Sequence, residues 1–211
     1  MQEVMIVTGG ARGIGAATAR LAAARGYAVC VNYLKNRATA ETVAGDIRAA
    51  GGRGIAVAAD VAVEAEVVSL FKTVDRELGT LTALVNNAGI LEQQMRLDQM
   101  DAARLNRILA TNVTGSFICA REAVRRMSTR HGGRGGAIVN VSSVAARVGS
   151  PDEYIDYAAS KGAIDTMTIG LSKEVAGEGI RVTAVRPGFI YTDMHASGGE
   201  PGRVEIGRAH V

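Results

Sequence analysis

The feature that most constrains the fold is an alternation of short apolar runs with longer stretches of helical periodicity. The runs are rich in valine, isoleucine and alanine, and most of the helical stretches end at a glycine. Strands are predicted at residues 4–8, 28–33, 54–59, 81–86, 137–142 and 181–186. Because strands that alternate with helices pair in parallel, we predict an α/β fold: a doubly wound, Rossmann-type parallel sheet with helices on both faces.

The chain has 211 residues, of which 47% are hydrophobic, and this is enough for one sizeable domain. We predict a single domain over residues 1–204. The net charge is only +3, with basic and acidic residues interleaved, so we expect no nucleic-acid partner. The densest basic stretch, residues 121–134, is interpreted as a solvated helix end whose cations complement the helix dipole.

Charge and hydropathy along the chain predict a soluble, cytoplasmic protein with no membrane partner. The first strand follows directly on residue 3, and no apolar run approaches the roughly 18 residues of a membrane span. Cys30 and Cys119 lie in apolar segments without metal-binding spacing, so they are predicted to be buried free thiols. The three histidines share no ligand-like spacing, and we expect no metal site.

A glycine-rich loop, TGGARGIG at residues 8–15, follows the first strand and opens a helix. Gly9, Gly13 and Gly15 allow a tight turn and a close approach of the backbone to a pyrophosphate, whose charge is favoured at a helix N-terminus. The spacing is G-x-x-x-G-x-G and differs from the commoner G-x-G-x-x-G. A tight strand-to-helix turn also needs glycine for steric reasons, so the loop alone leaves both interpretations open.

Further motifs follow the loop in a fixed order. They are Asp60-Val61 after the third strand, NNAG at 86–89, Asn112 in TNVTGSF, Ser143 in IVNVSS, Tyr157 and Lys161 in YAASK, and Pro187-Gly188 after the sixth strand. In these motifs, and over nearly its whole length, the chain resembles the short-chain dehydrogenase/reductase family. Among the branches of this family, it is most similar to the 3-oxoacyl-carrier-protein reductases and the sugar dehydrogenases.

The segment YIDYAASKGAIDT, residues 154–166, contains two tyrosines that compete for a catalytic role. A helix is predicted to begin at residues 150–153, with Ser150 as the cap and Glu153 closing a capping box, so that both tyrosines are helical. Tyr157 and Lys161 are then neighbours one turn apart, whereas Tyr154 lies two turns from the lysine. Tyr157 is therefore the catalytic candidate, and Tyr154 is interpreted as a packing residue or a contact on the substrate side. A tyrosine and a lysine at this spacing also occur on exposed helices without any chemical role.

The family resemblance implies hydride transfer between a nicotinamide and a small carbonyl or secondary alcohol. Tyr157 would be the general acid in reduction and the base in oxidation. Lys161 would lower the tyrosine's pKa and bind the nicotinamide ribose, and Asn112 would anchor a water for proton relay. Ser143 would hold the substrate oxygen, with Ser142 as its rival because adjacent strand side chains point to opposite faces.

The resemblance also implies a cofactor site. Its residues are Gly9, Arg12, Gly13, Ile14, Gly15, Tyr33, Asp60, Val61, Asn87, Ala88, Gly89, Tyr157, Lys161, Pro187, Gly188, Ile190 and Thr192. At the end of the second strand, Tyr33 stands where NAD-selective folds place a carboxylate. Arg12 matches the basic residue that relatives using NADP place beside the 2′-phosphate, with Lys35 and Arg37 as possible helpers. NADP(H) is therefore predicted, with NAD(H) as the alternative.

The end of the chain departs from the family pattern. The segment after Gly188 resembles the start of a mobile substrate lid, and relatives continue with a further helix and a seventh strand. We therefore expect six strands and a C-terminally truncated domain. Residues 205–211, EIGRAHV, back-translate to a sequence like that of a common sequencing-library adapter, and we hypothesise that they are a non-native tail.

Two classes of function are compatible with these motifs. The first is an oxidoreductase acting on a small-molecule substrate, whose full-length parent is expected to be a homo-oligomer. The second is a non-catalytic, dinucleotide-binding sensor or scaffold of the same fold. Ser143, Tyr157 and Lys161 are all present and favour the enzyme, because a sensor has no chemical need for a positioned phenol.

Overall fold

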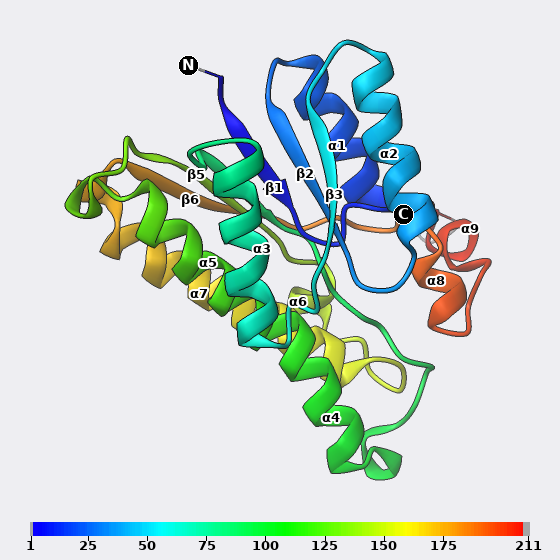
Figure 1. Cartoon of the computed structure of the whole chain (residues 1–211). Helices are drawn as coiled ribbons and strands as arrows, with labels where there is room; N and C mark the ends of the chain where they lie inside the picture. The colour runs from blue at the N-terminus through cyan, green and yellow to red at the C-terminus, as the bar shows by residue number, and fades with distance from the viewer. Residues whose placement is uncertain (1, 209–211) are drawn as a thin grey trace.

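The structure, a computed structural model, describes residues 2–208, and within them six strands form one parallel sheet (Figure 1). The strands are β1 (Val4–Val7), β2 (Ala28–Tyr33), β3 (Gly54–Ala58), β4 (Ala83–Asn86), β5 (Gly136–Val141) and β6 (Ile180–Val185). Their order is β3-β2-β1-β4-β5-β6, and every neighbouring pair is parallel. This confirms the doubly wound Rossmann-type sheet, and the predicted strand limits agree with it to within two residues.

Helices cover both faces of the sheet. Their limits are α1 (Gly13–Ala24), α2 (Arg37–Ala49), α3 (Glu64–Glu77), α5 (Gly115–Met127) and α7 (Ile155–Glu174). Figure 1 shows α1 and α2 on one side and α3, α5 and α7 on the other. Because successive strand residues point to opposite faces, Val7 and Val31 pack in the core under α1 and α2, whereas Ile6 and Cys30 pack in the core on the other face.

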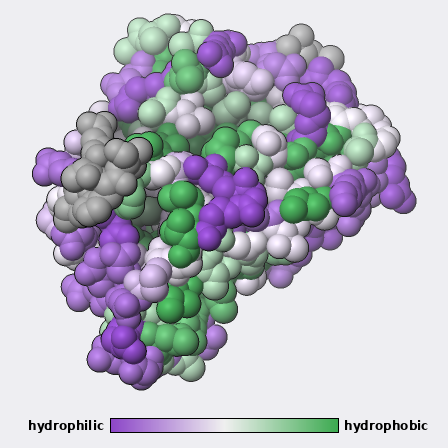
Figure 2. All heavy atoms as spheres, turned by 180° about the vertical axis from the view of Figure 1, so that it is seen from behind, coloured by the Kyte–Doolittle hydropathy of each residue, from purple (hydrophilic) through white to green (hydrophobic). Residues whose placement is uncertain are grey.

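The remaining elements are short and lie in the connections. They are η1 (Leu97–Gln99), α4 (Ala102–Leu109), the π-helical η2 (Ala110–Thr114), η3 (Thr129–His131), α6 (Ala145–Val148), η4 (Ala176–Glu178), α8 (Met194–Ser197) and α9 (Arg203–Arg208). The rear face of the molecule carries hydrophobic side chains in patches among hydrophilic ones (Figure 2).

The predicted start of the helix that carries the tyrosines is wrong. Ser150 and Asp152 have φ values of +46° and +61°, in the left-handed region, so residues 150–153 form a turn and no capping box. The Ser150 carbonyl accepts the N–H of Tyr154, which has φ −143° and stands at the N-cap of α7. Tyr154 is therefore not helical, while Tyr157 and Lys161 lie on α7 one turn apart as predicted.

The basic stretch is more buried than expected at one position. Arg121, Arg125 and Arg126 surround the carboxylate of Glu122, and Arg126 also pairs with Asp75 at 2.8 Å. The Arg126 side chain is only 17% exposed, which corrects the interpretation of a merely solvated helix end. Burial alone would raise the pKa of Glu122, but hydrogen bonds from Arg126 and Arg121 outweigh it and lower that pKa.

Other expectations concern single residues and the chain end. Cys30 and Cys119 are buried free thiols, as predicted. Among residues 2–208, no helix is long and apolar enough to cross a membrane, and the cytoplasmic location stays a prediction. Helix α9 runs across the predicted domain boundary after Val204, and residues 209–211 of the predicted tail lie outside the described residues. The domain limits and the non-native tail therefore stay predictions.

Candidate active site

The predicted site residues gather at the carboxyl ends of the strands, around a cavity of about 260 Å³. The first turn of α1 and the loops after β4, β5 and β6 contribute to its walls, as does the N-terminal half of α7. The predicted residues that line it are Ile14, Asn87, Ser143, Tyr157, Lys161, Pro187, Gly188, Ile190 and Thr192. Segments far apart in the sequence thus form one site, at the edge of the sheet where doubly wound folds bind ligands.

The glycine loop has the conformation that its sequence requires. Gly9 and Gly13 have φ values of +59° and +52°, in the left-handed region that favours glycine. A Cβ on Gly15 would lie 2.5 Å from the Gly9 carbonyl oxygen, so the start of α1 can pack against the loop only without a side chain. At the N-cap of α1, Arg12 makes no capping hydrogen bond with its side chain, and the first turn contains no acidic residue. The first N–H groups of α1 are therefore available to an anion.

Three polar side chains hold this loop in place. The Thr8 hydroxyl accepts the N–H groups of Asn87 and Ala88 at 2.9 and 3.0 Å, and the Asn87 amide donates to the Thr8 carbonyl at 2.9 Å. Asn32 accepts the N–H of Gly9 at 3.2 Å while its amide donates to main-chain carbonyls of β3 and the residues after it. Sequence reasoning missed Asn32, although a polar residue inside the apolar run AVCVNY must find buried partners.

Tyr157 and Lys161 lie on the face of α7 that borders the cavity. The Lys161 side chain is buried, and its Nζ donates to the Val141 carbonyl at 2.7 Å and lies 5.6 Å from the centre of the Tyr157 ring. The Ser142 hydroxyl donates to the main-chain carbonyl of Lys161, whereas the Ser143 hydroxyl is hydrogen-bonded with Tyr157. This geometry supports Ser143 as the serine that acts with Tyr157.

Burial controls the ionisation of this pair. It raises the pKa of Tyr157, and the hydrogen bond with Ser143 acts in the opposite direction. It lowers the pKa of Lys161 to about 8, against the attraction of Asp165. The net shift of Tyr157 is thus upward, opposite to the lowering expected from Lys161, because desolvation of the phenolate dominates. The Tyr157 phenol is therefore protonated at neutral pH.

Asn112 lies in the π-helical segment η2 and is fully buried. Its Oδ1 accepts the N–H of Ile90 at 2.8 Å, and its Nδ2 donates to the Ile90 carbonyl and to Ser160 Oγ at 3.0 Å each. A Cβ on Gly89 would lie 3.4 Å from Asn112 Oδ1 and 3.5 Å from Lys161 Nζ, so the loop after β4 passes close to both. Asn112 thereby joins this loop to α7, and its role in a proton relay stays a prediction.

The residues predicted to select the cofactor stand at the outer end of the site. Arg12 is exposed, with its guanidinium 4.0 Å from the exposed carboxylate of Asp193. Tyr33 ends β2 and is half-buried, while Lys35 and Arg37 just beyond it are exposed. The other predicted pair is arranged differently: the Asp60 carboxylate accepts the N–H of Ala62, and Val61 is buried in the core against Gly115.

The lid segment after β6 adds residues that sequence reasoning did not single out. Phe189, Met194 and His195 line the cavity. The Tyr154 hydroxyl donates to the Gly198 carbonyl at 2.9 Å, and the Arg203 guanidinium lies 4.9 Å from the Tyr154 ring. Tyr154 therefore packs against this segment and lines the cavity, which agrees with the predicted packing role, while a contact with substrate stays a prediction.

Comparison with known proteins yields one family over almost the whole chain. The model of the short chain dehydrogenase family matches residues 3–201. The uncharacterized oxidoreductase YgfF of Escherichia coli (strain K12) is 59% identical over 208 residues, which cover 99% of this chain and 84% of that protein. A 3-oxoacyl-[acyl-carrier-protein] reductase of Synechocystis sp. is 40% identical over 192 residues, 91% of this chain and 76% of its own length.

The fold comparison agrees. A dehydrogenase/reductase from Sinorhizobium meliloti 1021 has a crystal structure that matches with a TM-score of 0.90 at 32% identity. The match covers 99% of this chain and 80% of that one.

Proposed function

The chain belongs to the short-chain dehydrogenase/reductase family, and from this membership we propose that it uses NADP(H), with Tyr157 as acid and base, on a small carbonyl or secondary alcohol. The protein is a dehydrogenase/reductase that acts on CH–OH or carbonyl groups. The proposal rests on one observation above all. The cavity wall formed by Tyr157, Lys161 and Ser143 adjoins the glycine loop at Ile14 and Asn87, so a dinucleotide on the loop can present its reactive end to the phenol.

The residues present fit a dinucleotide. The glycines at 9, 13 and 15 let the loop pack closely against Ala88 and Thr192, and the Arg12 side chain does not cap α1, so main-chain N–H groups at the start of this helix can bind a pyrophosphate. The exposed guanidinium of Arg12 and the half-buried Tyr33 in place of a carboxylate favour the 2′-phosphate of NADP over the free ribose hydroxyl of NAD. When bound, the nicotinamide supplies hydride in reduction and accepts it in oxidation.

The protein's own residues handle the proton. In reduction, Tyr157 donates its phenolic proton to the carbonyl oxygen, and in oxidation it takes the proton of the alcohol. The hydroxyl of Ser143 donates a hydrogen bond to the same oxygen, where negative charge develops. Lys161, behind the Tyr157 ring, stabilises the phenolate by its charge once the proton has left.

The walls of the cavity indicate the kind of substrate. Leu91, Val144, Val148 and Phe189 are among the residues that line it, and all four are apolar. A volume of about 260 Å³ suits a small molecule. We therefore favour a compact substrate whose carbonyl or hydroxyl group is attached to an apolar body.

We also infer a homo-oligomer, with a second copy on the faces of α5 and α7. Phe117, Met167 and Leu171 line a groove of about 480 Å³ there, and the Phe117 side chain is half exposed. Apolar grooves of this kind are a common feature of subunit contacts. Sedimentation of the Phe117→Glu variant tests this, since a dimer held by this face would dissociate.

The experiment that tests the function compares two variants, Tyr157→Phe and Tyr154→Phe. The first removes the proposed acid and should lower turnover of a carbonyl panel by about two orders of magnitude or more, while NADPH binding survives. The second removes the hydroxyl that donates to the Gly198 carbonyl and should cost far less. Nicotinamide absorbance measures turnover, and quenching or enhancement of NADPH fluorescence measures binding. Equal losses in the two variants would contradict the assignment of Tyr157.

A further inference from the structure

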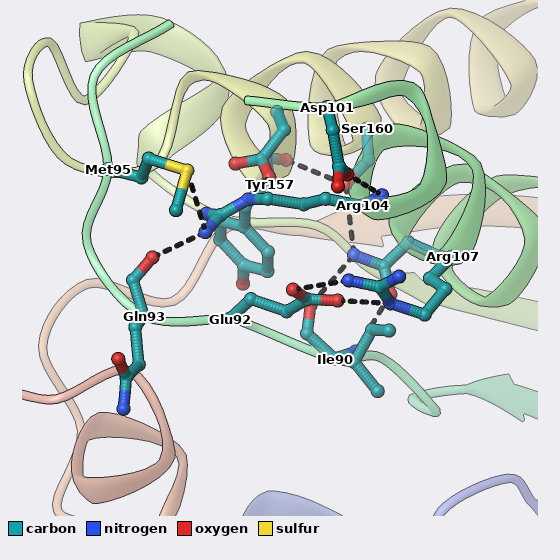
Figure 3. A network of polar contacts seen from close by, with 11 residues as sticks. Ile90, Glu92, Gln93, Met95, Asp101, Arg104, Arg107, Tyr157 and Ser160 are labelled. Carbon is teal, nitrogen blue, oxygen red and sulfur yellow. Dashed lines mark hydrogen bonds and ion pairs between the residues drawn. The ribbon is translucent and has the colours of Figure 1, made fainter. Parts of the chain in front are cut away.

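Arg104, on the first turn of α4, joins α4 to the loop that follows β4. Its main-chain N–H is capped by Asp101 Oδ1 at 2.7 Å, which fixes the start of the helix. Its Nη1 donates to the main-chain carbonyl of Gln93 at 2.7 Å and contacts the sulfur of Met95 at 3.9 Å. Figure 3 shows the Arg104 side chain reaching from the helix to Gln93 and Met95, next to Tyr157. One guanidinium therefore holds the middle of the loop.

The same guanidinium reaches the helix of the proposed acid. Arg104 Nε donates to Asp156 Oδ2 at 2.7 Å, and the two side chains are only 5% and 2% exposed. The other oxygen of Asp156 accepts the main-chain N–H of Tyr157 at 2.8 Å. That N–H belongs to the first turn of α7, where no intrahelical partner exists. The ion pair thus fixes the turn of α7 from which the Tyr157 side chain projects.

A contribution to stability does not by itself explain why Arg104 and Asp156 form a buried ion pair. A buried ion pair contributes little net stability compared with apolar residues of similar size, because desolvation offsets the attraction. Among residues 2–208, Arg104 Nη2 also has no hydrogen-bond partner although it is buried, an arrangement that a purely structural site avoids. What the pair provides is a defined geometry between three segments.

Two of those segments, the loop after β4 and α7, contribute to the cavity wall. Leu91 of the loop and Tyr157 of α7 both line the cavity, and Arg104 and Asp156 connect the elements that carry them. We propose that Arg104 and Asp156 are positioning residues, which set the distance between the substrate-binding loop and the proposed acid. This proposal rests on the proposed function, in which the substrate occupies the cavity that Leu91 and Tyr157 line.

Kinetics on Arg104→Gln, Asp156→Asn and the double variant test the proposal. Each single variant should lower kcat by about ten- to a hundredfold and raise KM for the carbonyl, while the Kd of NADPH stays unchanged. The double variant replaces the ion pair with two neutral amides that can hydrogen-bond, so its loss should be smaller than the combined losses of the single variants. Equal losses in kcat and in NADPH affinity would overturn the proposal.

Arg107→Gln is the matched control. Arg107 lies on the same helix and binds the same loop through Glu92 at 2.9 Å, but its side chain is 56% exposed (Figure 3). An exposed pair of this kind contributes little, so the variant should stay within about twofold of the parent protein in kcat and KM. If Arg107→Gln loses as much activity as Arg104→Gln, then the loss of any contact to the loop impairs turnover. That result would contradict a specific role of Arg104.

Hydrogen–deuterium exchange tests the positioning role of Arg104 and Asp156 without an activity measurement. In Arg104→Gln and Asp156→Asn, peptides covering residues 88–96 and 154–160 should exchange about tenfold faster, while a peptide covering β2 keeps its rate. Faster exchange throughout the chain would indicate a structural role only, and unchanged exchange would also refute the proposal. If the parent protein turns over no carbonyl, the proposed function fails, and the exchange result still decides whether Arg104 and Asp156 position the two segments.

Discussion

Replacing Gly15 with alanine tests whether the glycine loop is as tightly packed as the structure shows. Gly15 lies within α1 and needs no unusual φ, so the change acts through its new Cβ alone. That atom would lie 2.5 Å from the Gly9 carbonyl oxygen, 2.6 Å from Asn87 Nδ2 and 3.0 Å from Gly10 Cα. No Cβ is tolerated at such distances, so the loop or the Asn87 side chain must move.

The expected fall in the free energy of unfolding follows from the groups that the new Cβ displaces. Overpacking of this kind costs about 1–3 kcal/mol. Asn87 Nδ2 donates to the carbonyls of Thr8 and Gly9 at 2.9 and 3.1 Å, and each bond lost costs about 0.5–1.5 kcal/mol more. The higher helix propensity of alanine compared with glycine stabilises the protein by about 1 kcal/mol. The free energy of unfolding should fall by about 3 kcal/mol, which lowers the Tm of a chain of this length by about 6–12 °C.

Gly45→Ala is the control, because it is the same substitution at a helical glycine that has room for a side chain. Gly45 is half-buried in α2, and the nearest atom that a Cβ there would meet among residues 2–208 is Arg48 Nη2, at 3.9 Å. Helix propensity should then raise the Tm by about 2–4 °C. Thermal unfolding followed by circular dichroism measures both variants, and NADPH titration should show weaker binding only for Gly15→Ala. Equal melting temperatures for the two variants would refute the packing argument.

Three further predictions concern charge and buried polar groups. Arg12→Ala should weaken NADPH binding by about tenfold or more and leave NADH binding unchanged in parallel fluorescence titrations, and equal weakening of both would contradict the assignment. Because the pKa of Lys161 is lowered to about 8, the unfolded chain binds more protons than the folded one between pH 8 and 10.5. Urea unfolding should therefore show that the free energy of unfolding of the native protein rises over this range relative to that of Lys161→Met, by on the order of 2–3 kcal/mol. If the free energies of unfolding of the two proteins change with pH in parallel, the prediction is wrong. Thr8→Val should lower the free energy of unfolding by about 2–4 kcal/mol because it leaves the N–H groups of Asn87 and Ala88 without an acceptor, whereas Thr8→Ser should cost under about 1 kcal/mol.

Local patterns in the sequence determined the framework of this protein. Apolar runs alternating with helical periodicity predict the six parallel strands, because the side-chain periods of strand and helix are set by backbone geometry alone. The spacing of Tyr157 and Lys161 places both on one face of α7 for the same reason. The glycines at 9, 13 and 15 likewise predict a tight turn, and in the structure Gly9 and Gly13 have positive φ values that favour glycine.

Contacts between distant segments decided the rest. The capping box at residues 150–153 agrees with local propensity, yet the chain turns there through left-handed residues to bring Tyr154 against the lid. Arg104 and Asp156 are 52 residues apart, and nothing in either local sequence indicates that they pair. The upward shift of the Tyr157 pKa depends on burial by surrounding segments. Local sequence fixes dihedral preferences and periodicity, whereas partners and dielectric environment exist only once the segments have packed together.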